Sequence, residues 1–438
     1  MTGTAKTIYT IDPGIPFVDA LARGIVARIA KEDPDDPMAL ARLIVLVPTR
    51  RAVRSLSEAF LRTQPVVPML LPRMAALGDL DEDEILMSPG LTHMDDSLPP
   101  VIGGMRRQLK LARLVMEFGT HGWGQTPDAG QAAELALELA RFLDQMETEG
   151  IPFTALNGLE MAENLADHWQ KTLNFLEILT EYWPRELAEE DAIGPAEHRN
   201  RLLKAQSLAW QAHGPKGWVI AAGSTGSIPA TADLLDAVAG LEQGCVVLPG
   251  LDRDMNDDGW DQLGESHPQF GLAHLLKRFG LSRANVADFE TDWPHGLTSA
   301  APVSRVRLLA SALAPVPVTP ELDPPDALEG LTWVDCPEPS SEAGVIALMM
   351  RKALETPGGT AALVTPDRAL ARRVASRLGR WEIDVDDSAG TPLGATKPAV
   401  FFLLLADMVA THFAPVALLS CLKHPLASGG EQTSVFRA

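Results

Sequence analysis

Residues 8–21, IYTIDPGIPFVDAL, decide how the fold begins. An apolar run, a Pro-Gly turn and a segment that opens with Pro16 predict a strand, a tight turn and a helix, because proline suits the first turn of a helix. Phosphate-binding P-loops use the same order of elements, with the motif G-x-x-x-x-G-K-[S/T]. Here Asp12 stands where an anion would bind, Gly14 is the single glycine, and no Gly-Lys pair occurs in the 438 residues. We therefore expect an α/β unit with a degenerate nucleotide site at Asp12 and Gly14.

The composition is typical of a globular protein with a substantial core, because 46% of the residues are hydrophobic and 22% are charged. The length of 438 residues predicts about two to three domains. A formal net charge of −21 argues against non-specific nucleic-acid binding by the outer surface, but it permits a local basic strip. Aromatic residues make up only 5% of the chain, so we do not expect an aromatic platform that stacks bases.

The cysteines and the N-terminus indicate a compartment. Cys245, Cys336 and Cys421 lie far apart and form no C-x-x-C pair, so neither a disulfide framework nor a cysteine metal site is expected. The first residues lack the pattern of a signal peptide, and no apolar run is long enough to span a bilayer. We expect a cytoplasmic protein without a membrane partner.

Strand-like runs followed by helical patterns recur along the chain and predict parallel sheets. The expected strands are residues 43–47, 218–222, 245–248 and 361–364, and the expected helices that accompany them are residues 50–62, 231–241 and 367–380.

The middle of the chain, residues 104–213, is almost wholly helical in pattern. Residues 134–149 and 166–190 keep apolar side chains at spacings of three and four, with charges on the opposite face. We interpret this part as a helical insertion in an α/β domain. Further on, residues 315–325 (PVPVTPELDPP) cannot sustain a helix or a central strand and are interpreted as a linker.

Two stretches on either side of this linker resemble each other. Residues 46–61, LVPTRRAVRSLSEAFL, align without gaps with residues 363–378, LVTPDRALARRVASRL. Both show the end of a strand, a turn with proline and an Arg-rich helix. The similarity is either chance, since such text is common, or the sign of two related α/β lobes.

Arginines gather at the start of both helices. Thr49, Arg50, Arg51 and Arg54 open the first helix, and Arg368 opens the second. A helix N-terminus presents N–H groups and the positive end of a dipole, so nearby guanidinium groups would suit the phosphates of a nucleic-acid backbone. The alternative is a basic helix face that contacts only water.

A second pattern, residues 222–227 (AGSTGS), follows an expected strand and nearly matches the nucleophile elbow G-x-S-x-G. In a hydrolase, Ser224 would attack the substrate, and Asp252 with His267 or His274 would complete a triad. In an elbow the helix starts at once, whereas here Pro229 delays it. The alternative is a polar loop at the edge of a sheet.

An acidic run, residues 79–84 (DLDEDE), raises the possibility of a metal site. Consecutive carboxylates point in different directions, and acidic residues favour the first turn of a helix, so we interpret this run as a helix start in contact with water. The ten histidines form no H-E-x-x-H motif. We expect no metal ion and assign no catalytic residue.

Several stretches of the sequence, in the order in which they occur, resemble the sequences of one family. The stretches LARLIVLVPTRRAVRSLSEAFLR, LLPRMAALGDLDEDEIL, VIAAGSTGSIPATADLL, VVLPGLDRDM, HPQFGL, AALVTPDRALARRVASRL with the later VDDSAGTPL, and LLSCLKHPLA are similar to the AddB subunit of the bacterial AddAB helicase–nuclease, in its alphaproteobacterial form. The similarity extends through nearly the whole chain.

The resemblance implies an α/β fold with two RecA-like, superfamily 1 helicase-like lobes built on parallel sheets, the first with a large all-helical insertion. Residues 1–103 and 216–314 would form the first lobe, residues 104–215 the insertion, residues 315–329 a proline-rich linker, and residues 330–438 the start of the second lobe. The family's subunits are longer and end in a RecB-like nuclease domain, often with an iron–sulfur cluster. Nothing in this sequence matches that domain, so we expect an N-terminal portion without nuclease activity or cofactor.

The resemblance also implies a function in double-strand break repair by homologous recombination. The chain would be the inactive helicase-like subunit of a heterodimer with an AddA-type helicase–nuclease subunit, which uses the ATP, and it would contact double-stranded DNA ends and single-stranded DNA. By analogy with the helicase motif that holds the single strand, Thr49, Arg50 and Arg51 would contact DNA. Further expected DNA contacts are Arg54, Ser224, Thr225, Ser227 and Arg368. A serine hydrolase and a scaffold that contacts no DNA stay open as alternatives.

Overall fold

A computed structural model describes residues 6–34, 36, 38–63, 69–77, 98–119, 127–153, 155, 175–176, 178–290, 303–315 and 325–428. The chain divides into two compact units, Met1–Glu329 and Gly330–Ala438. The boundary between them falls at the end of the segment predicted to be a linker.

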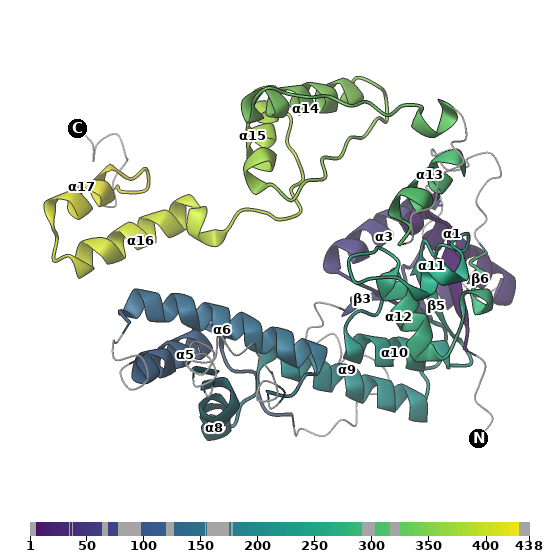
Figure 1. Ribbon diagram of the computed structural model, residues 1–438, viewed down its shortest axis with the longest axis horizontal. Coiled ribbons are helices and arrows are strands. Elements are labelled where there is room, and N and C mark those ends of the chain that lie inside the picture. The colour runs from purple at the N-terminus through teal and green to yellow at the C-terminus, as the bar shows by residue number, and fades with distance from the viewer. Residues whose placement is uncertain are drawn as a thin grey trace. The chain divides into compact units, whose positions relative to one another are not determined.

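The first unit is built around a six-stranded sheet (Figure 1). All strand pairs are parallel, in the order β3-β2-β4-β5-β1-β6. The predicted α/β fold with a parallel sheet is therefore confirmed. The strands are β1 (Ile8–Ile11), β2 (Ile44–Val47), β3 (Arg73–Ala76), β4 (Val219–Ala222), β5 (Gly244–Pro249) and β6 (Ala287–Asp288).

Helices cover both faces of this sheet, because alternate strand residues point to opposite sides. In β2, Val45 and Val47 belong to the core under one face, and Ile44 and Leu46 belong to the core under the other. The first face is covered by α1 (Phe17–Glu32) and α3 (Arg50–Thr63), and the second by α9 (Pro195–Ala212), α10 (Pro229–Ala239) and α12 (Phe270–Phe279).

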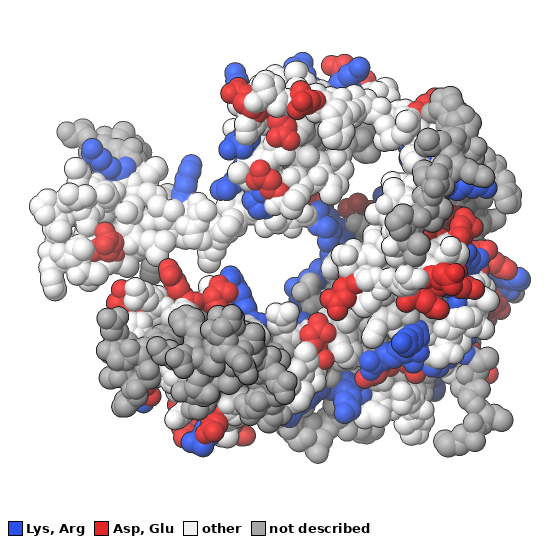
Figure 2. All heavy atoms as spheres, in the orientation of Figure 1, with Lys and Arg blue, Asp and Glu red and all other residues white. Residues whose placement is uncertain are grey.

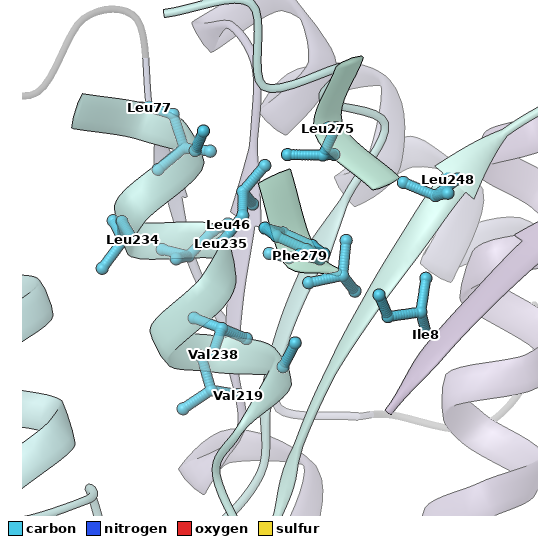
Figure 3. Packing of buried hydrophobic residues seen from close by; sticks show 14 of the residues in the cluster. Ile8, Leu46, Leu77, Val219, Leu234, Leu235, Val238, Leu248, Leu275 and Phe279 are labelled. Carbon is cyan, nitrogen blue, oxygen red and sulfur yellow. The ribbon is translucent and has the colours of Figure 1, made fainter. Parts of the chain in front are cut away.

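The second core shows how the helices are held (Figure 3). Leu235 and Val238 of α10 and Phe279 of α12 pack against Leu46 and Leu248 of the strands, and all five side chains are buried. Complete burial of an aliphatic or aromatic side chain of this size contributes about 1.5–3 kcal/mol to stability. The core therefore fixes where each helix starts relative to the strand before it.

The predicted helical insertion contains α5 (Gly104–Phe118), α6 (Ala129–Glu149), a π-helical turn (Ile178–Tyr182) and α8 (Trp183–Glu189). Their shared core includes Leu111, Val115, Leu143 and Trp183. Asp128 and the side chain of Gln131 form a reciprocal capping box at the start of α6. In the following helix α9, Leu203 and Trp210 pack into the core of the sheet.

The other described elements of the first unit are three helices and two short 3-10 helices. The helices are α2 (Ala39–Arg42), α11 (Asp257–Asp261) and α13 (Val303–Leu313), and the 3-10 helices are Arg283–Asn285 and Pro325–Leu328.

In the described residues of the second unit, the regular secondary structure is helical, and irregular segments connect the helices. The helical elements are α14 (Pro339–Leu354), α15 (Arg368–Gly379), a 3-10 turn (Leu393–Ala395), α16 (Lys397–Ala410) and α17 (Pro415–Lys423). A small core joins α14 to α15 through Ala343, Ala347, Leu370, Val374 and Leu378.

The strand predicted at residues 361–364 is wrong. These residues form no strand, and Val364 is 94% exposed. A parallel strand exists only where a neighbouring strand pairs with its N–H and C=O groups, and residues 330–428 as described contain no strand at all. The second RecA-like sheet that the resemblance implies is therefore absent from the described part of this unit.

Candidate functional site

The loops that follow β1, β2, β4 and β5 meet at one edge of the sheet, which we call the carboxyl edge. The adjacent strands β2 and β4 send their helices to opposite faces, since α3 lies on the first face and α10 on the second. Such a point, where the winding direction of an open parallel sheet reverses, is the usual place for a ligand. The loops after β2 and β4 are those in which the sequence predicts DNA contacts.

The start of α3 carries the predicted Arg cluster. Thr49 caps the helix, because its Oγ1 accepts the backbone N–H of Ala52 at 3.1 Å. Arg50 and Arg51 are exposed in the first turn, which contains no acidic residue. Arg54 is exposed one turn later and pairs with Glu58 at 3.3 Å. Cations are unfavourable at this positive end of the helix dipole, so the arrangement favours an anionic ligand.

The hydroxyl-bearing side chains of the loop after β4 differ in their exposure to solvent. Ser224 is half-buried, and its Oγ accepts the N–H of Gly226 at 3.2 Å. Thr225 packs against Gly271 of α12, where an added Cβ would lie 3.1 Å from the Thr225 Cβ. Ser227 is exposed. Of the three predicted contacts in this loop, Ser227 is therefore the most accessible, and Thr225 has a packing role.

Phe17 lies next to the loop after β4, and it was not among the site residues predicted from the sequence. It is the first residue of α1, and its ring is half-buried. A Cβ added to Gly223 would lie 3.2 Å from Phe17 Cε1 and 3.6 Å from Pro48 Cδ. Phe17 and Pro48 therefore each lie against Gly223, and the next residues along the two loops are Thr49 and Ser224. The large aromatic residue directly after Pro16 was the one available signal.

The turn after β1, predicted as a degenerate nucleotide site, is closed by its own hydrogen bonds. The side chain of Asp12 accepts the N–H of Gly14 at 2.9 Å, and the carbonyl of Asp12 accepts the N–H of Ile15 at 3.1 Å. Pro13 and Pro16 have no N–H to donate. A P-loop binds phosphate through N–H groups that point at the ligand, and in this turn those groups are already used or missing.

The same turn is packed against the loop after β5. A Cβ added to Gly250 would lie 3.0 Å from the Cβ of Pro13, and Gly250 has a φ of 60°, which favours glycine. Protein atoms therefore fill the space beside the turn. The end of β4 adds no acidic side chain, because Ala222, Gly223 and Ser224 follow one another there.

The proposed hydrolase triad is not assembled in the described residues. Ser224 bonds within its own loop, and Asp252 accepts two backbone N–H groups of its own turn at 2.9 and 3.0 Å. His267 accepts a backbone N–H through Nδ1 at 3.1 Å, and His274 stacks on an aromatic ring one turn earlier. No hydrogen bond connects Ser224 to either histidine in the residues that the structure describes.

Arg368, the remaining predicted contact, lies in the second unit at the start of α15. Its guanidinium binds the carboxylate of Asp387 through two hydrogen bonds of 2.9 and 2.8 Å and the carbonyl of Gly390 at 3.2 Å. The Asp387 partner raises the pKa of Arg368 further. Asp367 caps the helix, and the N–H groups of Leu370 and then Ala369 lower the pKa of its carboxyl. Arg368 thus holds the 387–390 loop in place.

The similarity between α3 and α15 does not extend to their packing. The gap-free alignment pairs Leu61, which is 60% exposed, with Leu378, which is fully buried. The two helices therefore bury residues at different positions of the alignment.

Metal and thiol chemistry have little support in the described residues. No group of three His, Cys, Asp or Glu side chains in them converges on a point that could hold a metal ion. The acidic run at residues 79–84 lies outside the described residues. Burial raises the pKa of the Cys245 thiol to about 12, so this cysteine stays protonated.

The surface carries charges of both signs. Figure 2 shows Lys and Arg interspersed with Asp and Glu over the visible face of the first unit, without one continuous basic field. The described helices include none that is long and apolar enough to cross a membrane. Comparisons of the sequence with models of known protein families and with curated proteins give no match.

Proposed function

We propose that this chain is the non-catalytic, helicase-like part of an AddB-type subunit that acts in double-strand break repair by homologous recombination. In this role Met1–Glu329 is a RecA-like lobe with a helical insertion, and Gly330–Ala438 contributes to a second lobe. The chain guides single-stranded DNA in the cytoplasm and binds an AddA-type helicase–nuclease subunit. That partner subunit hydrolyses the ATP and acts on double-stranded DNA ends.

One observation carries the proposal. The carboxyl edge presents hydroxyl and guanidinium groups that would bind a nucleic-acid backbone, whereas its turn after β1 has neither the available N–H groups nor the lysine that would bind the phosphates of ATP. Thr49, Arg50 and Arg51 stand at the start of α3, beside the hydroxyl-bearing loop after β4. The turn after β1 uses its own N–H groups, and it offers no lysine. A sheet edge of this kind supports binding to phosphates without hydrolysis of a nucleotide.

The negative net charge is compatible with this role. A charge of −21 repels free DNA from the outer surface, so we expect weak DNA binding by the isolated chain and tighter binding within the assembled complex. A local group of arginines then determines where the strand is held.

The second unit supports a protein partner. Phe402 and Leu403 of α16 and Val416 and Leu419 of α17 are each more than half exposed, and Figure 2 shows few charged side chains over these two helices. Extended apolar surfaces of this kind mark protein–protein contacts. We propose no occupant for this surface beyond the partner subunit named above.

The test is made on the assembled complex, with Arg50 and Arg51 both changed to Glu. Binding to single-stranded DNA should fall about tenfold or more, because two guanidinium contacts are lost and two negative charges are added. Arg141, which is exposed on α6 and pairs with Glu138 on its own helix, gives the matched control Arg141→Glu. Unchanged DNA handling in the double variant would favour a pure scaffold.

The hydrolase alternative has its own test. A reactive-serine probe should leave the chain unlabelled. Labelling that disappears in Ser224→Ala would contradict the proposed function and establish a nucleophilic serine.

A further inference from the structure

The N-terminus of α9 is capped by a side chain from another helix. Gly194, the residue before α9, has no side chain that could accept a hydrogen bond. In its place the Oε2 atom of Glu147, near the end of α6, accepts the N–H of Glu197 at 3.2 Å. A capping side chain normally accepts the N–H of the second or third helical residue, and Glu197 is the third residue of α9. Glu147 therefore acts as the capping residue of α9.

The carboxyl group of Glu147 fits this place because position 194 is a glycine. A Cβ added to Gly194 would lie 2.8 Å from Oε2 and 3.0 Å from Oε1 of Glu147. The carboxyl group therefore occupies the space in which the side chain of an ordinary capping residue would lie.

Two further hydrogen bonds join the same helices. Asn200 Nδ2 donates to the carbonyl of Glu147 at 2.6 Å, and the guanidinium of Arg199 donates to Oγ1 of Thr148 at 2.9 Å. We call the contact made by Glu147, Thr148, Glu197, Arg199 and Asn200 the α6–α9 joint.

The joint connects two separate cores of the first unit. On the α6 side, Leu139 and Leu143 belong to the core of the helical insertion. On the α9 side, Leu203 and Trp210 belong to the core of the sheet. The state of the joint therefore affects how firmly the insertion is attached to the sheet.

The groups around the carboxyl of Glu147 have opposing effects on its charge. Burial is the main cause that raises the pKa of Glu147 to about 7, whereas Arg107 of α5 and the N–H of Glu197 lower it, and the carboxylates of Glu197 and Asp144 raise it. Arg107 is itself engaged, because it pairs with Asp144 at 2.8 Å and donates to the carbonyl of Ala140 at 3.2 Å. The other titratable side chains in the first two turns of α9 are His198, Arg199 and Arg201.

We propose that the α6–α9 joint is a proton-dependent device, which holds the helical insertion to the sheet when Glu147 is protonated and opens locally when Glu147 is ionised. A protonated carboxyl still accepts the N–H of Glu197 through its carbonyl oxygen. An ionised one must stay partly out of contact with water in the closed joint, which is unfavourable. This inference does not rest on the proposed function, because it involves no DNA contact.

The direction of the pH effect follows from the pKa of Glu147. A carboxyl whose pKa is raised in the closed joint favours the closed joint at low pH. In the open joint water reaches the carboxyl, and its pKa returns to the ordinary range of a glutamate. Opening therefore becomes more frequent as the pH rises from that range to about 7.

The experiment measures amide hydrogen exchange of the full chain by mass spectrometry, with each rate expressed relative to an unstructured chain at the same pH. The protection of amides in residues 146–151 and 196–201 should fall about tenfold or more between pH 5 and pH 7.5. Amides of α10 and α12 should be better protected than those of the joint at every pH, because opening of the joint leaves the core of the sheet intact.

Three variants test the role of the carboxyl. Glu147→Gln keeps the shape and stays neutral, so the protection of the joint should no longer fall with pH. Gly194→Ser gives α9 a cap of its own in the space of the carboxyl group, and it should also remove the fall. Glu138→Gln changes a side chain of α6 that is 67% exposed and keeps Glu147, so it should show the same fall as the unchanged chain.

A fall that persists in both Glu147→Gln and Gly194→Ser, or that is absent from the unchanged chain, would overturn the proposal. Equal protection of the joint and of α10 and α12 at every pH would overturn it too, since the first unit would then open only as a whole. Protection of α10 and α12 at pH 5 shows whether each variant is folded.

Discussion

The ring of Phe17 lies so close to Gly223 that a Cβ at that glycine would be 3.2 Å from Phe17 Cε1. This contact connects the turn after β1 with the loop after β4, although β5 lies between the two strands. The same glycine lies next to the start of α3, since a Cβ there would be 3.6 Å from Pro48 Cδ.

Gly223→Ala should destabilise the first unit by about 1–3 kcal/mol, because a Cβ at a positive φ is strained and would also crowd the Phe17 ring. Chemical unfolding measures the change. Gly104→Ala is the matched control, since a Cβ there meets nothing within 4 Å, and it should cost nothing or stabilise α5 slightly. Equal stability of the two variants would contradict the described contact.

Arg28 should contribute strongly to stability. Its guanidinium lies over the rings of Tyr9 at 5.0 Å and Trp218 at 4.8 Å, and it donates to the Tyr9 hydroxyl at 3.0 Å. Arg28→Gln should lower the free energy of unfolding by about 2 kcal/mol, since cation–π contacts are strongest where water is excluded. Thermal unfolding tests this value.

An exposed pair provides the comparison for Arg28. Arg141 bonds Glu138 at 2.6 Å on the surface of α6, so Arg141→Gln should change stability by less than about 0.5 kcal/mol. An Arg28 variant that behaves like the Arg141 variant would show that the aromatic rings do not hold the guanidinium.

Stability should depend on pH through Glu147. Burial raises its pKa to about 7, against the opposing effect of Arg107 and the N–H of Glu197, while Glu197 and Asp144 add to the rise. A carboxyl with a raised pKa in the folded state stabilises the fold below its unfolded pKa, and this contribution is lost as pH rises through about 7.

Replacing Glu147 with Gln should therefore make the chain relatively more stable as the pH rises. The difference in unfolding free energy between the variant and the unchanged chain should grow by about 1–3 kcal/mol between pH 5 and pH 8. Glu138→Gln, on the exposed face of the same helix, is the matched control for the substitution itself. A flat difference for Glu147→Gln would mean that its carboxyl is not buried in the folded chain.

Nucleotide should leave the chain's stability unchanged. A ligand at a hundred times its dissociation constant stabilises a fold by about 2.7 kcal/mol, so millimolar Mg-ATP would raise the unfolding temperature if a nucleotide site existed. We expect no shift, because the N–H groups of Gly14 and Ile15 are already bonded to Asp12. A clear rise would contradict the closed turn.

The parts of the fold that could be predicted are those in which a run of apolar residues clearly indicates a buried strand. Strands β1, β2, β4 and β5 carry branched apolar side chains that fill both cores, and each was predicted. Strand β3, with the sequence RMAA, and the two-residue β6 lack that pattern, and they exist because a neighbouring strand pairs with them. The prediction of a strand at residues 361–364 was wrong for the opposite reason, since a strand-like run without a neighbouring strand forms no strand.

Only some features of the candidate site could be predicted from the sequence. The helix start at Thr49 and the arginines beside it could be predicted because capping and helix-start signals are local in sequence, whereas their contact with DNA stays a prediction. Phe17 was missed because its contact with Gly223 arises only when the start of α1 meets the loop after β4. The bond between Arg368 and Asp387 was not predicted, because Asp387 lies on a later loop.

The most direct test of the central claim is a pulldown of the tagged chain from extract of its own cells, followed by mass spectrometry. The proposal predicts recovery of a large ATP-dependent helicase–nuclease subunit in equal amount. A matched bait in which Val416 and Leu419 of α17 are changed to Ser should recover less of it if the exposed apolar surface takes part. Repeated pulldowns that recover the tagged chain without any helicase–nuclease would contradict the proposed role.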